Sequence, residues 1–153
     1  MELDTFDKKI LTLLQQGDTL SQRDLADKVN LSASAVNRRI SALKRAGIIT
    51  RDISVIDQSK VGRPLTVICQ VKMENERLAL LLQDKQRFVA CPQVQQVYYV
   101  TGEFDFLLVL NVRDMTEYEA LTRELFFSSD NIKSFNTIVS MDNAKQTQTV
   151  LIE

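Results

Sequence analysis

The chain has 153 residues, which is enough for one domain or for two small ones with modest cores. An apolar fraction of 44% and a charged fraction of 25% are typical of packed globular proteins and exclude a disordered chain, and no stretch approaches the roughly 18 apolar residues of a membrane span. The net charge of −1 combines +3 over residues 1–51 (nine basic, six acidic) with −4 over residues 52–153 (ten basic, fourteen acidic), so only the first part is expected to face a polyanion.

Three short helices are predicted in the first 50 residues. Their candidate N-caps are Asp4, with Asp7 three residues on, Ser21, with Asp24, and Ser32. In the third helix Val36, Ile40 and Leu43 form an apolar stripe at i, i+4 and i+7. Asn30 tolerates the left-handed backbone of a tight corner before this helix, and Gly47 is suited to end it. The pattern predicts a trihelical module over residues 1–50.

A strand-like segment, Ile48 to Ile56, follows these helices, and the helix-turn-helix is expected to be of the winged kind. Polar residues at 57–60 break it, and Gly62-Arg63-Pro64 is typical of a domain boundary. We therefore expect a helix-turn-helix domain at 1–50, a strand and linker at 51–63, and a second domain at 64–153.

The second domain has a predicted βαββαβ order, which is the ferredoxin-like α+β arrangement. The expected strands are Leu65–Lys72, Val94–Thr101, Phe106–Val112 and Ile132–Val139, with a possible terminal strand at Thr147–Ile152. One helix is expected to be capped by Asn75, with Leu78, Leu81, Leu82, Phe88 and Val89 inward. The other begins with a capping box of Asp114 and Glu117 and has Met115, Tyr118, Leu121 and Leu125 inward.

The strand Phe106–Val112 is apolar on both faces, because Leu107 and Val109 alternate with Phe106, Leu108, Leu110 and Val112. Two helices can cover only one face of such a sheet, and an open face should be polar if water covers it. Val97 and Tyr99 extend the apolar character onto the neighbouring strand. A second copy of the domain would cover this face, so we expect at least a dimer.

The third helix carries a basic polar face of the kind that enters the major groove of DNA. Between Ser32 and Ala46 it has four basic residues and no acidic one. The expected base-edge contacts are Ser34, Asn37, Arg38 and Ser41, and the expected backbone contacts are Lys44, Arg45, Arg23 and Arg51. Arg39, at the edge of the apolar face, is equally suited to an ion pair with an acid of the first two helices and to a phosphate contact. A merely solvated helix face is the alternative for the whole surface.

These residues resemble a known family. Leu25-Ala26, Leu31-Ser32, Val36, Arg39-Ile40, Leu43 and Gly47-Ile48-Ile49 resemble the helix-turn-helix of the Lrp/AsnC (feast/famine) transcriptional regulators. The segment Val100–Leu108 resembles the amino-acid-sensing turn of that family, and the likeness spans almost the whole chain. The family more often has Asp at the position of Glu103 and Gly at that of Asn30.

The resemblance implies dimers through paired C-terminal sheets, assembly into octamers or similar rings, and an amino-acid effector bound between dimers. By motif, the effector positions are Gly102 and Asp105, with Tyr99, Thr101 and Phe104 around them and Met115, Thr137 and Val139 beyond. Backbone N–H groups at Gly102 could hold an α-carboxylate and Asp105 an α-ammonium, although ordinary hairpin geometry and turn capping explain both residues equally well.

An enzyme is disfavoured, because histidine is absent and the four glycines are scattered. Cys69 and Cys91 match no metal or redox spacing, so no metal or other cofactor is expected, and a reduced, cytoplasmic, nucleoid-associated location fits. The first hypothesis is a sequence-specific, oligomeric regulator of transcription that binds double-stranded DNA. The alternatives are an architectural DNA-binding protein without an effector and a metabolite sensor whose helices contact protein.

Overall fold

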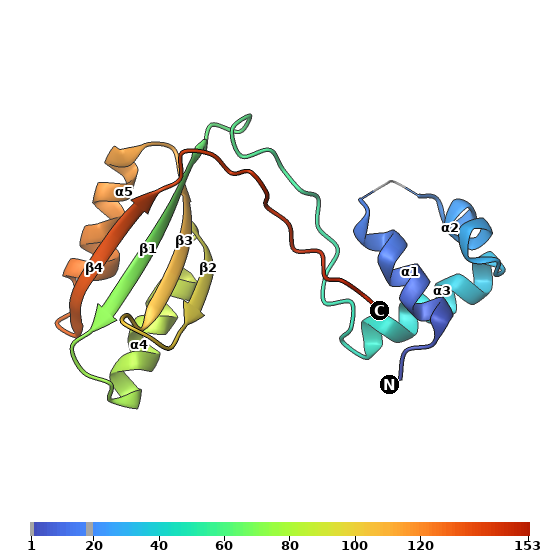
Figure 1. Cartoon of the computed structure of the whole chain (residues 1–153), viewed down its shortest axis with the longest axis horizontal. Coiled ribbons are helices and arrows are strands. Elements are labelled where there is room, and N and C mark those ends of the chain that lie inside the picture. Colours follow the sequence, from blue (N-terminus) through green and yellow to red (C-terminus); the bar gives the residue numbers. More distant parts are fainter. Residues whose placement is uncertain (1, 18–19) are drawn as a thin grey trace. The chain divides into compact units, whose positions relative to one another are not determined.

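A computed structural model describes residues 2–17 and 20–153, and the chain divides into two compact units (Figure 1). The helical unit comprises the described part of Met1–Val55 together with Gln146–Glu153. The sheet unit comprises Ile56–Lys145. No helix in the described residues is both long and apolar enough to cross a bilayer.

Three helices build the helical unit, as the sequence predicts: α1 (Thr5–Gln15), α2 (Gln22–Val29) and α3 (Ala33–Arg45). Each begins at the expected cap. The Asp4 and Ser21 side chains form reciprocal capping boxes with Asp7 and Asp24, and Ser32 accepts a hydrogen bond from the Ala35 N–H. These bonds satisfy N–H groups that have no partner inside the helix, which fixes where each helix starts.

Two left-handed residues end α2 and α3. Asn30 has φ 56° and ψ 46°, the Leu31 N–H donates to the Ala26 carbonyl, and the Asn30 N–H donates to the Asp27 carbonyl. Gly47, with φ 72°, makes the same pair of bonds after α3. This pattern is the Schellman motif. At Asn30 it forms the corner between α2 and α3 and so fixes the direction in which α3 leaves.

The core of the helical unit is small and includes the C-terminal end of the chain. Ile10, Leu25, Val36 and Leu43 are buried among the three helices, and Ile152 packs against the same cluster. The Gln15 side-chain amide accepts a hydrogen bond from the Val150 N–H at 2.7 Å and donates one to the Val150 carbonyl at 3.1 Å. The C-terminal tail therefore belongs to the fold of this unit.

Two strand predictions in this unit are wrong. Thr147–Ile152 forms no strand, because the backbone of Val150 bonds to a side chain of α1 where a sheet would supply a neighbouring strand. Ile48–Ile56 also forms no strand, and Ile53 and Val55 are 61% and 91% exposed. Apolar and polar residues do alternate in Ile48–Ile56, but no other strand of the described chain forms backbone hydrogen bonds with this segment.

The sheet unit has the predicted βαββαβ order. Its elements are β1 (Leu65–Met73), α4 (Leu78–Ala90), β2 (Val94–Tyr99), β3 (Phe106–Val112), α5 (Met115–Thr122), the π-helical turn η1 (Arg123–Phe127) and β4 (Ile132–Val139). The sheet is antiparallel with strand order β2-β3-β1-β4, which is the ferredoxin-like topology.

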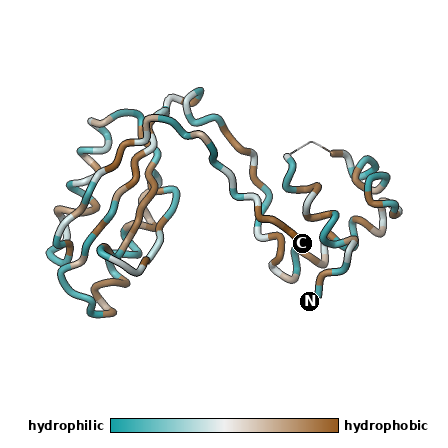
Figure 2. The backbone as a smooth tube through the Cα atoms, viewed as in Figure 1, coloured by the Kyte–Doolittle hydropathy of each residue, from teal (hydrophilic) through white to brown (hydrophobic). Residues whose placement is uncertain are grey.

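One face of this sheet is covered by α4 and α5 (Figure 1). The core there combines one face of β1 and β3 with three aromatic side chains, Phe88, Phe106 and Phe126, which meet edge to face at centroid distances of 5.4 and 6.1 Å. Figure 2 shows the central part of the sheet coloured predominantly as hydrophobic. The covered face thus holds the unit together by burying most of its apolar surface.

The opposite face is open, and its centre is apolar. The strand register aligns Ile68 with Val109 and with Ile138, and Leu107 with Tyr98, across the four strands. Tyr98 and Ile138 are exposed, and Ile68, Leu107 and Val109 are half-buried. The expectation of an uncovered apolar face is confirmed, although β2 contributes Tyr98 to it, whereas Val97 and Tyr99 pair with residues of the covered face.

The inward faces of the two helices of the sheet unit differ in part from the prediction. In α4 the buried stripe is Leu81, Asp84 and Phe88, so Leu78, Leu82 and Val89, about 100° around the helix, are exposed. Arg77, and not Asn75, occupies the N-cap. Met115, expected inward, is 46% exposed because it precedes the first core-facing position of α5, Tyr118. Asp114 caps α5, but Glu117 accepts a hydrogen bond from the Arg113 N–H, so the capping box is only half formed.

Candidate nucleic-acid interface and effector positions

The outward face of α3 is polar and cationic. With about 100° between successive residues, Ser34, Arg38, Ser41 and Arg45 lie opposite the buried pair Val36 and Leu43. All four outward side chains are exposed. The apolar side of α3 is buried in the core of the helical unit, so the polar side faces solvent.

One edge of this face is tied to neighbouring segments. The Asn37 Nδ2 donates to the Gln22 Oε1, on the first residue of α2, at 2.8 Å. The Lys44 ammonium lies 2.6 Å from the Asp52 carboxylate, just beyond α3. Sequence reasoning assigned no role to Gln22 or Asp52. For Gln22, the only signal in the sequence was that it is the first residue of a predicted helix.

The opposite edge of α3 is anchored to α1. The Arg39 guanidinium lies 2.7 Å from an Asp7 oxygen and 2.8 Å from an Asp4 oxygen, and 5.4 Å from the centre of the Phe6 ring. The hydrogen bonds that Arg39 donates to Asp7 and then to Asp4 raise the pKa of Arg39, and the hydrogen bond from the Asp7 N–H chiefly lowers the pKa of Asp4. Of the two readings of Arg39, the structure supports the ion pair with acids of the first helix.

Four arginines of this surface are available to an external anion. Arg38 and Arg45 lie on the outward face of α3, Arg23 lies in the first turn of α2, and Arg51 follows α3; all are exposed. In the described part of the chain none of them has a carboxylate within ion-pairing distance. The helical unit therefore presents unneutralised positive charge around α3.

The turn between β2 and β3 contains the first group of effector positions. Gly102 has φ 131°, which a residue with a side chain rarely adopts. Asp105 closes the turn: its N–H donates to the Val71 carbonyl, its carbonyl accepts from the Val100 N–H, and its Oδ2 accepts from the Met73 N–H at 2.7 Å. The carboxylate therefore joins this turn to the end of β1 and makes no hydrogen bond to the turn's own backbone among the described residues.

The side chains around this turn differ in exposure. Tyr99 is 60% exposed and lies with its ring centre 5.2 Å from that of Phe106. Thr101 is exposed and Phe104 is half-buried. Together with Gly102 and Asp105 these residues lie at the turn end of the β2–β3 hairpin.

The second group of effector positions lies elsewhere in the sheet unit. Thr137 and Val139 are on β4, at the opposite edge of the sheet from β2, which is three strand spacings or about 14 Å away. Met115 follows the far end of β3, whose seven residues span about 20 Å from the hairpin turn. Within one chain, the structure therefore does not bring the two groups together.

Thr137 is part of a small internal hydrogen-bond network. Its hydroxyl lies 2.6 Å from that of Tyr118, which also contacts the Cys69 sulfur at 3.7 Å. Burial raises the pKa of Tyr118, and it raises the pKa of the Cys69 thiol to about 11. Both groups are therefore neutral at ordinary pH and serve to join α5 to the sheet.

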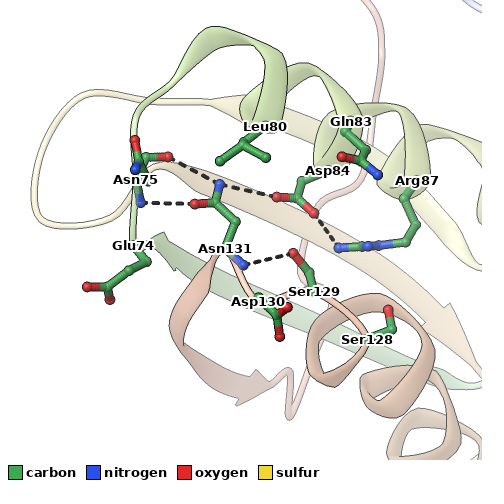
Figure 3. Close-up of a pocket in the computed structure, with 10 residues that line it drawn as sticks. All are labelled: Glu74, Asn75, Leu80, Gln83, Asp84, Arg87, Ser128, Ser129, Asp130 and Asn131. Atoms are coloured by element: carbon green, nitrogen blue, oxygen red, sulfur yellow. Dashed lines mark hydrogen bonds and ion pairs between the residues drawn. The ribbon is translucent and has the colours of Figure 1, made fainter.

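A polar pocket of about 410 Å³ lies between α4 and the segment before β4 (Figure 3). The buried Asp84 carboxylate pairs with Arg87 and accepts a hydrogen bond from the Asn131 side chain. Asn131 also exchanges hydrogen bonds with the backbone of Asn75. These contacts join α4 to the segment before β4, although the buried Arg87 Nε has no partner among the described residues. In the described residues no three acidic, cysteine or histidine side chains gather as a metal site.

Two family models match this chain, one for each unit. Residues 3–50 match a model described as a winged helix-turn-helix DNA-binding domain. Residues 66–150 match the Lrp/AsnC ligand binding domain. The matches agree with the positions of the three helices and of the ferredoxin-like sheet.

Individual relatives match over nearly the full length. An uncharacterised HTH-type transcriptional regulator of Sinorhizobium fredii is 41% identical over all of this chain and 90% of its own length. The crystal structure of an AsnC family transcriptional regulator from Agrobacterium tumefaciens superposes with a TM-score of 0.91 at 29% identity, covering 97% of each chain. A transcriptional regulator from Neisseria meningitidis, solved in complex with L-Met, has the same fold, with a TM-score of 0.91 at 24% identity over 98% of this chain and 97% of its own.

Proposed function

The chain belongs to the Lrp/AsnC family of transcriptional regulators, and we propose that it acts as an oligomer that reads a specific DNA sequence with α3 and responds to an amino acid. As a member of this family the chain has a DNA-binding helix-turn-helix and a ligand-binding domain. The proposal adds the residues that bind DNA, the assembly and the location of the effector.

The observation that carries the proposal is the outward face of α3. Arg38 can engage guanine O6 and N7 with two hydrogen bonds, Asn37 can engage adenine, and Ser34 and Ser41 are short enough to let the helix approach the base edges. Arg23, Lys44, Arg45 and Arg51 are proposed to contact phosphates. Because Arg39 is held by α1, its role is to orient α3.

A dimer through the open face of the sheet is proposed on physical grounds. Ile68, Leu107, Val109, Tyr98 and Ile138 form an apolar centre on that face. An isolated sheet exposes such a surface to water at a cost of about 25 cal/mol for each Å². A second copy of the same face would cover it with two-fold symmetry.

An effector that touched both groups of proposed positions would need more than one chain. The turn group (Tyr99, Thr101, Gly102, Phe104 and Asp105) and the second group (Met115, Thr137 and Val139) are separated by about 14 Å or more, which exceeds the length of a small amino acid. A site between dimers would bring a turn of one chain near the second group of another. The L-Met complex of the Neisseria meningitidis regulator is consistent with an amino-acid ligand for this fold.

DNA binding is tested by titrating a labelled duplex with the full-length protein at several salt concentrations. The logarithm of the affinity should fall by about 0.9 per logarithm of salt for each phosphate neutralised. Arg45→Ala should lower the affinity for all duplexes and reduce the magnitude of this slope by about 0.9, the contribution of one phosphate contact. Lys85→Ala, which removes an exposed cation from α4, is the matched control.

Sequence-specific and architectural binding are separated by Arg38→Ala. If Arg38 reads a base, the variant loses preference at one position of the site, with a cost of about 1–3 kcal/mol. A uniform loss over all sequences would instead favour the architectural alternative. Failure to bind any duplex at low salt would leave the helices as a protein-contacting surface.

Effector binding is tested by sedimentation velocity of the full chain with each of the twenty amino acids in turn. The active one should shift the distribution between dimers and larger assemblies, because a ligand bound between dimers favours the assembly that contains its site. An unchanged distribution with every amino acid would contradict the sensor proposal.

A further inference from the structure

The contact between Gln22 and Asn37 joins the two helices of the helix-turn-helix. Gln22 is the first residue of α2, and Asn37 lies in the second turn of α3. The Asn37 Nδ2 donates to the Gln22 Oε1 at 2.8 Å. In the described part of the chain, neither the Asn37 Oδ1 nor the Gln22 Nε2 has a partner, so both remain available to another molecule.

This hydrogen bond changes what Asn37 can recognise. A side-chain amide has one acceptor oxygen and two N–H donors on one nitrogen. With one N–H committed to Gln22, Asn37 retains one donor and one acceptor. Adenine presents the complementary pair in the major groove, the N6 donor and the N7 acceptor, whereas guanine presents two acceptors, O6 and N7. The contact therefore removes the arrangement in which both Asn37 hydrogens face guanine.

The Gln22 Oε1 accepts the hydrogen bond from Asn37, whereas the Nε2 at the same end of the side chain is a donor. This Nε2 has two N–H donors and belongs to the first turn of α2, next to the exposed Arg23; the one acidic residue of that turn, Asp24, is bonded to the Ser21 N–H and hydroxyl. A DNA phosphate offers only acceptors. The donors would then run in one direction, from adenine N6 to Asn37, from Asn37 to Gln22, and from Gln22 to the phosphate, and such a chain strengthens each of its members.

We propose that Gln22 is a positioning residue for base readout, which holds the Asn37 amide so that α3 selects adenine over guanine and which bonds to the flanking phosphate with its own Nε2. This inference rests on the proposed function, because it requires α3 to lie in the major groove. It assigns the specificity of one base position to a residue of α2 that does not itself touch a base.

The experiment selects duplexes from a randomised pool on the full-length protein and sequences the pool before and after selection. The wild-type chain should prefer adenine to guanine by about tenfold or more at one position of each half-site. Asn37→Ala identifies that position, because it should remove the preference for adenine there and leave the preferences at the other positions unchanged.

Two substitutions of Gln22 then separate positioning from phosphate binding. Gln22→Ala removes the acceptor, so the preference at the Asn37 position should fall to about twofold while the other positions stay unchanged. Gln22→Glu keeps an acceptor for Asn37 but replaces the donor with a negative charge. It should keep the adenine preference and lower the affinity for all duplexes several-fold. Both changes are at an exposed first helical position, and a far-UV circular dichroism melt checks that each variant folds.

Four outcomes would overturn the inference. Full adenine preference in Gln22→Ala would show that Asn37 needs no positioning, and loss of preference in Gln22→Glu would show that an acceptor at this position is not what matters. Both leave the proposed function intact. Wild-type binding with no base preference at any position would remove the inference and favour the architectural alternative over sequence-specific binding. The absence of salt-dependent binding to any duplex would remove the inference together with DNA binding itself.

Discussion

Asn30 offers a direct test of how the corner between α2 and α3 is stabilised. It adopts φ 56° and ψ 46°, a left-handed conformation that costs most L-residues about 1–2 kcal/mol and Asn less. Asn30→Ala should therefore lower the free energy of unfolding of the helical unit by about 1 kcal/mol. Asn30→Gly relieves the strain but adds about 0.5–1 kcal/mol of backbone entropy to lose on folding, so its net effect should be small. Asn30→Val, which is β-branched, should be the least stable of the series.

The two units can be followed separately because the chain has no tryptophan and its three tyrosines, Tyr98, Tyr99 and Tyr118, all lie in the sheet unit. In a urea titration, tyrosine fluorescence reports the sheet unit alone, and far-UV circular dichroism reports the helices of both units. A urea m-value of about 1 kcal/mol/M is expected for a unit of this size, so 1 kcal/mol should move the midpoint by about 1 M.

The shift in the Asn30→Ala variant should appear in the circular dichroism transition and not in the tyrosine transition. An Ala variant that unfolds at the midpoint of the Gly variant would refute the reasoning, since it would mean that a side chain at this corner carries no left-handed strain.

Three further predictions concern the sheet unit and the C-terminal tail. Hydrogen bonding from the Arg113 N–H lowers the pKa of Glu117 from its ordinary 4.5 to about 2, so the stability that it contributes is present above about pH 4.5 and is lost as the pH falls towards 2; Glu117→Gln should flatten this dependence in tyrosine-monitored urea titrations. A variant as pH-sensitive as the wild type would assign the effect to other groups. Cys69, whose pKa burial raises to about 11, should stay unlabelled by a thiol reagent at neutral pH until the sheet unit unfolds, as followed by mass spectrometry, and rapid labelling of the native chain would contradict its burial. Truncation after Lys145 removes Ile152 from the core of the helical unit and should destabilise that unit by about 1–2 kcal/mol while the tyrosine transition stays in place; a shift of the tyrosine transition alone would be inconsistent with the tail packing on α1.

The division of the chain into domains at residues 51–63 remains a prediction for limited proteolysis of the full-length protein. An exposed linker should be cut first, and its cleavage should leave a resistant fragment that contains the sheet. If the earliest cuts fall within β1 or α3, the boundary has been drawn in the wrong place.

The sequence alone was sufficient for the features that depend on neighbouring residues. The caps Asp4, Ser21 and Ser32 bond to backbone groups three residues away, and the left-handed corner at Asn30 depends on one residue, so both could be recognised from spacing and residue type. The four strands of the sheet followed from their apolar and β-branched residues, and its apolar open face followed from the lack of a polar face in Phe106–Val112; neither needs knowledge of the partner strand.

Tertiary structure decided which distant residues meet. That Arg39 pairs with Asp7 and that Asn37 bonds to Gln22 depends on the angle between helices, and that Val150 bonds to Gln15 depends on where the end of the chain returns. The two expected strands failed for the same reason: an alternating segment becomes a strand only when another backbone lies beside it. The separation of Thr137 from Gly102 likewise follows from the strand order, because strands that are remote in sequence can be neighbours while a hairpin and the last strand lie at opposite edges of one sheet.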